Sequence, residues 1–233
     1  ILRSLGGGAA GMLMPRCATA ESTPHPTARY WRPAGGAVRC ELCPHHCLLD
    51  PGRTGTCRVR QNRGGTLVTT GYGNPCAVHV DPIEKKPMYH MLPGSKAFSI
   101  AVAGCNLRCR NCQNASISQI SPAQSRTVDL PPQTVVERAI AAGCRSIAYT
   151  YSEPTVWFEY MYDTARLARE KGLKNIWVTA GFINPRPLRE LASVMDGANI
   201  DLKSFSNDIY ERLNAGSLAP VLRTLSIARE EGI

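Results

Sequence analysis

The amino-acid sequence predicts an α/β fold built around a parallel sheet. From residue 97 onward, short apolar runs alternate with longer stretches that have helical spacing, and Gly or Pro residues separate them. Cysteines and charged residues, whose side chains can bind metals or ligands, recur directly after the apolar runs. Because the carboxyl ends of strands in a parallel barrel open on one face, we expect these polar residues to meet there.

The predicted strands and helices follow one another in strict alternation. Their order is strand 97–103, helix 132–142, strand 146–150, helix 154–171, strand 175–179, helix 185–194, strand 198–202 and helix 218–231. This alternation predicts right-handed crossovers between parallel strands. About four strand–helix units fit into the chain.

Local signals support each element in turn. The strands are short and almost entirely apolar, as expected for strands buried on both faces. The first helix has apolar residues at helical spacing and ends at Gly143. Pro154 suits the first turn of the second helix, and Gly172 suits its C-cap. Pro185 suits the start of the third helix. The fourth helix is predicted from the spacing of apolar residues over 218–231.

Composition excludes several classes of protein. The chain has 233 residues, of which 43% are hydrophobic and 19% charged, so disordered and collagen-like architectures are excluded. No run reaches the roughly 18 apolar residues of a transmembrane helix. Ten cysteines are too few for a disulfide scaffold, which usually exceeds about 8% cysteine. Because the sequence begins at Ile1 and stops at Ile233, we expect a fragment that is open at both ends.

The net charge of +9 is concentrated near the N-terminus. Residues 1–63 contain nine arginines and three acidic residues. We interpret this as a solvated basic face, because no aromatic residues interleave with the arginines as nucleic-acid stacking would require. Residues 1–20 resemble the end of a twin-arginine-type export signal, with an A-x-A site at 18–20. We expect a disordered extension of a cytoplasmic protein, and export by such a signal is the alternative.

Seven of the ten cysteines form two groups. The N-terminal cysteine group is Cys40, Cys43, Cys47 and Cys57, and the central cysteine group is Cys105, Cys109 and Cys112. Short spacings in a chain without a disulfide pattern indicate metal ligation. Three thiolates in the central group suit three corners of a cubane iron–sulfur cluster. No fourth ligand follows nearby, so one metal position stays open, as in a reactive site. A zinc knuckle and unligated core thiols are the alternatives.

The sequence around the central cysteine group resembles the radical S-adenosylmethionine (radical SAM) superfamily. The motifs that carry the resemblance are GCNLRCRNC at 104–112, CPHHC at 43–47, DPIEKKP at 81–87, CQN at 112–114 and AYTYSEPT at 148–155. They are similar to the AmmeMemoRadiSam-system radical SAM enzymes, which are relatives of pyruvate formate-lyase activating enzyme. The resemblance covers residues 39–233. It departs at Asn111, where the family usually has an aromatic residue.

The resemblance implies a function and its cofactors. Cys105, Cys109 and Cys112 would hold a [4Fe–4S] cluster that cleaves S-adenosylmethionine (SAM) reductively to a 5′-deoxyadenosyl radical. An external one-electron donor such as flavodoxin or ferredoxin would supply the electron. The fold would be a partial (β/α) barrel of the radical SAM type, truncated after about four of its six strand–helix units. No catalytic residue is assigned beyond the cluster ligands, and the substrate is not identified.

Three further residues are expected to bind SAM. Glu153 stands at the position of the family's Gly-Gly-Glu motif and would accept a hydrogen bond from the SAM amino group. A simple acidic residue at a helix N-terminus is the alternative. Asp201 and Lys203 resemble the D-x-K motif of glycyl-radical activating enzymes and would share one face of a strand. The alternative for this pair is an ion pair at the mouth of the barrel.

The N-terminal cysteine group is expected to form a closed four-thiolate zinc site, with sulfurs roughly 3.5–4 Å apart. An auxiliary cluster and a redox pair are alternatives, and His45 and His46 are further candidate ligands. Residues 81–87 are expected to form an ordered loop, from which Lys85 and Lys86 could cover the cluster. The remaining cysteines are interpreted as buried thiols: Cys17, Cys76 and Cys144.

The predicted organisation has three parts: an extension over 1–38, a Cys-rich segment over 39–96 and a radical SAM core over 97–233. The main hypothesis is a radical SAM enzyme, and glycyl-radical activation is its alternative. A zinc- or iron–sulfur-binding interaction module is the alternative of a different class. Such a module has no need for Glu153, Asp201 and Lys203 beside the cysteines.

Overall fold

The computed structural model describes residues 25–233, and its main element is a five-stranded sheet in the order β10-β9-β8-β7-β6. The strands are β6 (Ala77–Pro82), β7 (Lys96–Ala101), β8 (Ser146–Tyr149), β9 (Lys174–Thr179) and β10 (Gly197–Ile200). β7 to β10 run parallel, and β6 is antiparallel to β7. The predicted α/β fold with a partial barrel of parallel strands is confirmed.

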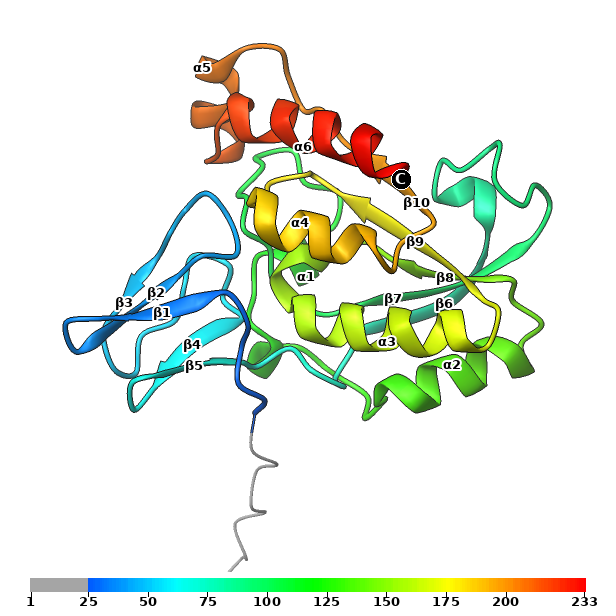
Figure 1. Cartoon of the computed structure of the whole chain (residues 1–233), viewed down its shortest axis with the longest axis horizontal. Helices are drawn as coiled ribbons and strands as arrows, with labels where there is room; N and C mark the ends of the chain where they lie inside the picture. The colour runs from blue at the N-terminus through cyan, green and yellow to red at the C-terminus, as the bar shows by residue number, and fades with distance from the viewer. Residues whose placement is uncertain (1–24) are drawn as a thin grey trace, which may run out of the picture.

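The long helices follow the strands in the predicted order (Figure 1). They are α2 (Pro132–Ala141), α3 (Phe158–Glu170), α4 (Pro185–Ala192) and α6 (Leu218–Glu231). α2 and α3 contact β8, and α6 packs on α4. The predicted helix from residue 154 is divided, because a 3-10 turn, η3 (Pro154–Trp157), precedes α3. Pro occupies the first turn of α2, η3 and α4, as its fixed φ and missing N–H favour.

The central strands β7 and β8 are buried on both faces of the sheet, and alternate residues of β7 show what packs on each face. Phe98 and Ile100 belong to the main core under the helices. Ala97 points to the opposite side, where it meets Ile83 and Met91 from the segment between β6 and β7. This alternation is the period of two that a strand imposes. The segment after β6 therefore covers part of that face of the sheet.

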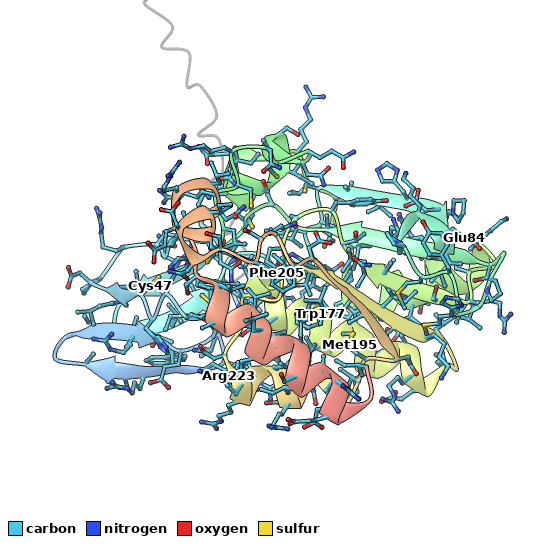
Figure 2. All side chains as sticks on the ribbon, turned by 90° about the horizontal axis from the view of Figure 1, so that it is seen from above. Cys47, Glu84, Trp177, Met195, Phe205 and Arg223 are labelled. Atoms are coloured by element: carbon cyan, nitrogen blue, oxygen red, sulfur yellow. The ribbon has the colours of Figure 1, made fainter. Side chains whose placement is uncertain are left out.

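A lobe of short strands lies beside the main sheet (Figure 1). One antiparallel sheet contains β1 (Trp31–Ala34), β2 (Ala37–Cys40) and β3 (Leu48–Leu49), and a hairpin contains β4 (Arg60–Arg63) and β5 (Thr66–Thr69). Figure 2 shows Cys47 of this lobe at one end of the molecule and Glu84 at the other. A buried ion pair between Arg60 and Glu159 joins the lobe to α3.

The expectation of a loop over residues 81–87 is wrong in its first part. β6 continues through Pro82, and the 3-10 turn η1 (Ile83–Lys85) follows it. β6 is an edge strand in which His79 and Val80 are exposed, so it lacks the apolar run that signals a buried strand. Pairing with β7 over six residues defines it instead.

Short elements complete the described chain. They are α1 (Ala115–Ser118), η2 (Pro122–Gln124), α5 (Asn207–Ile209) and the π-helical turn η4 (Tyr210–Asn214). Within residues 25–233, no helix combines the length and apolar character needed to cross a membrane. The export-signal features over 1–20 and Cys17 lie outside the described residues.

Candidate metal and cofactor site

A cavity of about 570 Å³ opens at the carboxyl ends of the parallel strands. Residues that end or follow all four strands line it: the central cysteine group after β7, Glu153 after β8, Thr179 in β9, and Asp201 and Lys203 after β10. The predicted meeting of these four segments is confirmed. Carboxyl ends of barrel strands are the usual place for active sites in such folds. Asn111 also lines the cavity, beside Cys112.

Each sulfur of the central cysteine group has one polar neighbour. The contacts are the Leu107 N–H to Cys105 Sγ at 3.3 Å, the Asn214 amide to Cys109 Sγ at 3.1 Å, and Ser118 Oγ to Cys112 Sγ at 3.2 Å. Hydrogen bonds of this kind orient metal ligands and tune the centre that they hold. The loop between β7 and α1 therefore presents three supported thiols to the cavity.

The contact from Asn214 depends on the π-helical turn η4. The turn ends at Ala215, whose φ of 54° lies in the left-handed region. Asn214 is buried, and its Oδ1 atom has no hydrogen-bond partner within the described part of the chain. π-helical turns are often found at functional sites. Nothing in the sequence indicates this contact, because Asn214 is 105 residues away from Cys109 and belongs to no motif.

The thiol of Cys105 is strongly influenced by its surroundings. Burial raises the pKa of Cys105, and the negative charge of Glu153 raises this pKa further. The Leu107 N–H acts on the pKa in the opposite direction. At neutral pH the free thiol is therefore protonated, so binding of a metal must release a proton from it.

Glu153 is only 2% exposed, yet it lines the cavity. Its Oε1 atom accepts hydrogen bonds from the Thr155 N–H at 3.0 Å and the Thr179 hydroxyl at 2.7 Å, and its Oε2 atom accepts from the Ala180 N–H at 2.9 Å. It therefore caps η3 and ties the end of β8 to the end of β9. Throughout residues 25–233, no Lys or Arg forms a salt bridge with it; the nearby pairs use Asp81 and Asp201. A buried carboxylate without a salt-bridge partner suits a positively charged ligand group.

Asp201 and Lys203 form an ion pair at the cavity wall. The Lys203 Nζ atom lies 2.6 Å from Asp201 Oδ2. Both residues lie beyond β10, which ends at Ile200, so the predicted strand to residue 202 is too long. Partial burial acts to lower the pKa of Lys203, but the hydrogen bond and charge of Asp201 outweigh it and raise this pKa. The pair thus presents one anion and one cation to the cavity.

A second charged cluster borders the cavity and was not predicted as a unit. Asp81 accepts hydrogen bonds from Lys85 at 2.9 Å, from Lys86 at 2.6 Å and from the Tyr151 hydroxyl. Burial acts to raise the pKa of Asp81, but these donors outweigh it and hold the pKa well below its usual range. Lys86 is 1% exposed, and its ammonium lies 4.4 Å from the Tyr151 ring centroid. Lys85 and Tyr151 line the cavity, whereas Lys86 is held in the buried pair.

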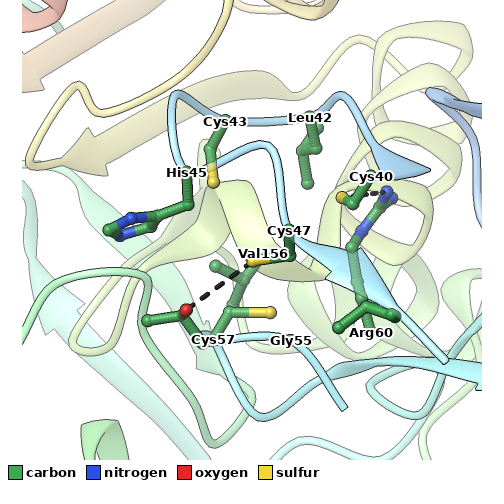
Figure 3. Close-up of a pocket in the computed structure, with 11 residues that line it drawn as sticks. Cys40, Leu42, Cys43, His45, Cys47, Gly55, Cys57, Arg60 and Val156 are labelled. Atoms are coloured by element: carbon green, nitrogen blue, oxygen red, sulfur yellow. Dashed lines mark hydrogen bonds between the residues drawn. The ribbon is translucent and has the colours of Figure 1, made fainter. Parts of the chain in front are cut away.

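The N-terminal cysteine group surrounds a separate, small cavity of about 10 Å³ (Figure 3). All four cysteines line it, as their spacing predicts. The structure does not show the tetrahedral zinc site predicted for them, however. Nowhere in residues 25–233 do three Cys, His, Asp or Glu side chains stand in an arrangement that could hold one metal ion. Burial raises the pKa of the Cys57 thiol to about 11.

The two histidines beside this group have different positions. His45 lines the small cavity, but its Nε2 atom lies 2.7 Å from the carbonyl oxygen of Asn106. His46 is exposed, with a φ of 44°. Of the other cysteines, Cys144 is buried in the main core as predicted. Cys76 is only half-buried, which corrects the prediction of a buried thiol.

Fold and site together define an α/β protein with an open cavity that is lined by three thiols and by charged side chains. The family model of the Radical SAM superfamily matches residues 99–233. The chain therefore belongs to the radical SAM superfamily of enzymes. Membership implies a [4Fe–4S] cluster and SAM as cofactors. The cavity fits both groups, because it combines three thiols with acidic and basic side chains.

The chain is similar to known proteins. An uncharacterized protein of Methanocaldococcus jannaschii, MJ0808, is 44% identical over 196 residues. The match covers 84% of this chain and 58% of that relative, so the chain spans less than two thirds of the relative's length. A solved structure of TYW1 with a lysine–pyruvate adduct bound is similar over 73% of this chain and 64% of that chain. Its sequence identity is 19% and its TM-score is 0.44.

Proposed function

We propose that this chain is a radical SAM enzyme of the AmmeMemoRadiSam system, in which Cys105, Cys109 and Cys112 hold the [4Fe–4S] cluster. The observation that carries the proposal is the cavity of about 570 Å³ in which this cysteine group faces Glu153 and the Asp201–Lys203 pair. When bound, the cluster and SAM supply one-electron cleavage to methionine and a 5′-deoxyadenosyl radical, which abstracts hydrogen from a substrate.

In this proposal the protein side chains bind and orient SAM. Glu153 accepts a hydrogen bond from the SAM amino group, and this contact gives the buried carboxylate a cationic partner. Asp201 and Lys203 lie where an anion and a cation can bracket the zwitterionic amino acid end of SAM. Leu107, Val178 and Ala180 supply apolar lining that limits access of water.

Two motifs beyond the cluster loop support the AmmeMemoRadiSam assignment. The 81–87 motif supplies Asp81, Lys85 and Lys86, and Lys85 lines the cavity. The 148–155 motif supplies Tyr151, which bonds Asp81, as well as Glu153. The two motifs therefore interact across the sheet at the cavity wall. We retain the division into segments 39–96 and 97–233 as part of the proposal, with β6 contributed by the first segment.

The test is anaerobic reconstitution with iron and sulfide, followed by incubation with SAM and dithionite. We expect 5′-deoxyadenosine to form with methionine in equal amounts. A variant with Cys105, Cys109 and Cys112 changed to Ala should form none. Cys76→Ala is the matched control, because Cys76 is a half-buried free thiol outside both groups. Product formation by the triple variant would contradict the assignment of the cluster ligands.

Glycyl-radical activation is a second candidate function, supported by the Asp201–Lys203 ion pair and its similarity to the D-x-K motif. In that case the hydrogen atom would come from the Cα of a glycine in a polypeptide. A polypeptide substrate labelled with α-deuterated glycine should then transfer deuterium to 5′-deoxyadenosine. Transfer from a small molecule instead would reject this candidate.

A further inference from the structure

The N-terminal cysteine group is a built cavity that the proposed function does not use. Figure 3 shows its cysteines around one space, together with Leu42, Val156 and Arg60. The free volume between the four cysteines is about 10 Å³. The sulfur atoms of Cys47 and Cys57 lie 3.6 and 3.8 Å from the position that a Cβ would take on Gly55. Glycine at this position keeps the wall of the cavity clear between these two thiols.

The spacing of the sulfurs distinguishes one metal ion from a cluster. Four thiolates around a zinc ion, with bonds of about 2.3 Å, would lie roughly 3.8 Å apart. In the described chain, no three such ligands meet around one ion. In a four-iron cluster each cysteine binds a different iron, so the sulfurs lie farther apart. The central cysteine group, whose family implies such a cluster, also lacks single-ion spacing in the same structure.

The surroundings of the small cavity suit a closed centre. Leu42, Leu49 and Val156 are buried and shield it from solvent. Arg60 is 1% exposed, and its Nη1 atom lies 3.8 Å from Cys40 Sγ. Because Arg60 is also paired with the buried Glu159, it supports the ligands through its contact with Cys40 and not through a free positive charge. Four cysteines would ligate all four irons, so no position would remain open for SAM.

The two cysteine groups are neighbours through their backbones. Gly104 has a φ of 113°, and a Cβ on it would lie 2.7 Å from the carbonyl oxygen of Cys57 and 2.4 Å from Val59 Cγ2. The ring of His45 contacts the carbonyl oxygen of Asn106 at 2.7 Å. Gly104 and Asn106 flank Cys105 directly. The loop of the N-terminal group therefore touches the loop of the central group on both sides of its first ligand.

From these observations we infer that Cys40, Cys43, Cys47 and Cys57 bind a second iron–sulfur cluster of the [4Fe–4S] type, fully ligated by protein. Because the two loops touch, we expect the two reduced centres to interact magnetically. The inference concerns metal content and does not depend on SAM cleavage by the central group.

The decisive experiment uses the variant in which Cys105, Cys109 and Cys112 are changed to Ala, so that only the N-terminal group can bind metal. After anaerobic reconstitution with ⁵⁷Fe and sulfide in the presence of zinc, we expect about four iron and four sulfide per chain. The Mössbauer spectrum should be that of a cubane cluster. One zinc per chain, or no bound metal in the folded variant, would overturn the inference.

The wild-type chain keeps the inference testable if this variant does not fold. It should bind about eight iron, and Cys47→Ser, at a half-buried ligand, should lower this number toward about four. Cys76→Ser is the matched control and should leave the iron content unchanged. When fully reduced, the wild type should show an electron paramagnetic resonance (EPR) signal broadened by interaction between the clusters. About four iron in the wild type, with no change in Cys47→Ser, would contradict the second cluster.

Discussion

The central cysteine group borders a cavity of about 570 Å³, whereas the N-terminal cysteine group encloses one of about 10 Å³. The first has three cysteines and faces carboxylates and ammonium groups. The second has four cysteines and is walled by buried aliphatic side chains and one arginine. The two groups come from one chain and touch through the backbone, so the difference lies in what surrounds the thiols.

This difference shows how cysteine ligands can serve two different purposes. A metal that lacks one protein ligand and lies beside polar groups allows a cofactor to bind and react. A closed set of ligands in an apolar shell keeps solvent and cofactors away, which leaves structural support or electron transfer as its use. The fold achieves this by placing one group at the carboxyl ends of the parallel strands and the other within the β1–β5 lobe.

The largest expected effect is on SAM cleavage, and it distinguishes the central from the N-terminal cysteine group. Replacing Cys105, Cys109 and Cys112 by Ala should reduce formation of 5′-deoxyadenosine to background, because no site for the reacting cluster remains. With dithionite as reductant, Cys47→Ser should retain activity within about tenfold, since SAM does not meet that group. Chromatographic quantification of 5′-deoxyadenosine measures both. Equal loss in the two variants would remove the distinction between an open and a closed site.

The next effect is on stability and concerns two ion pairs beside the open cavity. Asp81→Asn should destabilise the protein by about 3–5 kcal/mol, because it leaves the buried Lys86 without a charged partner. Asp201→Asn, at the half-exposed pair with Lys203, should cost at most about 1 kcal/mol. Urea-induced unfolding measures both free energies.

The pH dependence of the stability difference between wild type and Asp81→Asn follows from the lowered pKa of Asp81. The stabilisation from ionised Asp81 is complete above its ordinary pKa of 3.8 and is lost as the pH falls below that value. The stabilities of wild type and Asp81→Asn should therefore converge in acid. A constant difference between them down to the acid transition would show that Asp81 contributes through packing alone.

The junction between the two groups should be sensitive to a single methyl group. Gly104→Ala should cost about 3 kcal/mol, because the added Cβ would meet Cys57 and Val59 and the backbone has a positive φ. Gly143→Ala is the matched control, since it has a φ of 66° and open space around it, and it should cost about 1 kcal/mol. Thermal unfolding and iron content are the measurements. Similar losses at both positions would mean that the two loops do not constrain each other.

The last expected effect concerns SAM affinity. Glu153→Gln should weaken SAM binding by about 1.5–3 kcal/mol, or roughly 10- to 100-fold, because a charged hydrogen-bond acceptor is lost. Iron bound by the N-terminal group should stay unchanged, since Glu153 lines only the large cavity. Equilibrium binding of SAM under anaerobic conditions tests the first statement. Unchanged affinity would reduce Glu153 to a cap of η3 that also joins the ends of β8 and β9.

Much of the main sheet could be predicted because its signals are local. Each parallel strand is a short apolar run, and proline opens the helical segments after β7, β8 and β9. The meeting of Glu153, Asp201 and the central cysteines follows from strand direction alone. β6 was missed because an edge strand with exposed His79 and Val80 has no apolar run.

The rest of the site depends on contacts between distant parts of the chain. Asn214 reaches Cys109 across 105 residues, and Tyr151 reaches Asp81 across 70. No periodicity or spacing encodes such pairs. The spacing of the sulfurs in the N-terminal group is also invisible in the sequence, because C-x2-C-x3-C suits a single ion and a cluster equally well.

The contrast between an open and a closed cluster is tested most directly by the response of each to SAM. The measurement records EPR spectra with and without SAM. It compares the reduced wild type with the reduced variant in which Cys105, Cys109 and Cys112 are changed to Ala. We predict that SAM changes the spectrum of the wild type, because one iron of the central cluster lacks a protein ligand. The spectrum of the variant, which retains only the N-terminal cluster, should not change. A shift in the variant, or no shift in the wild type, would contradict the account.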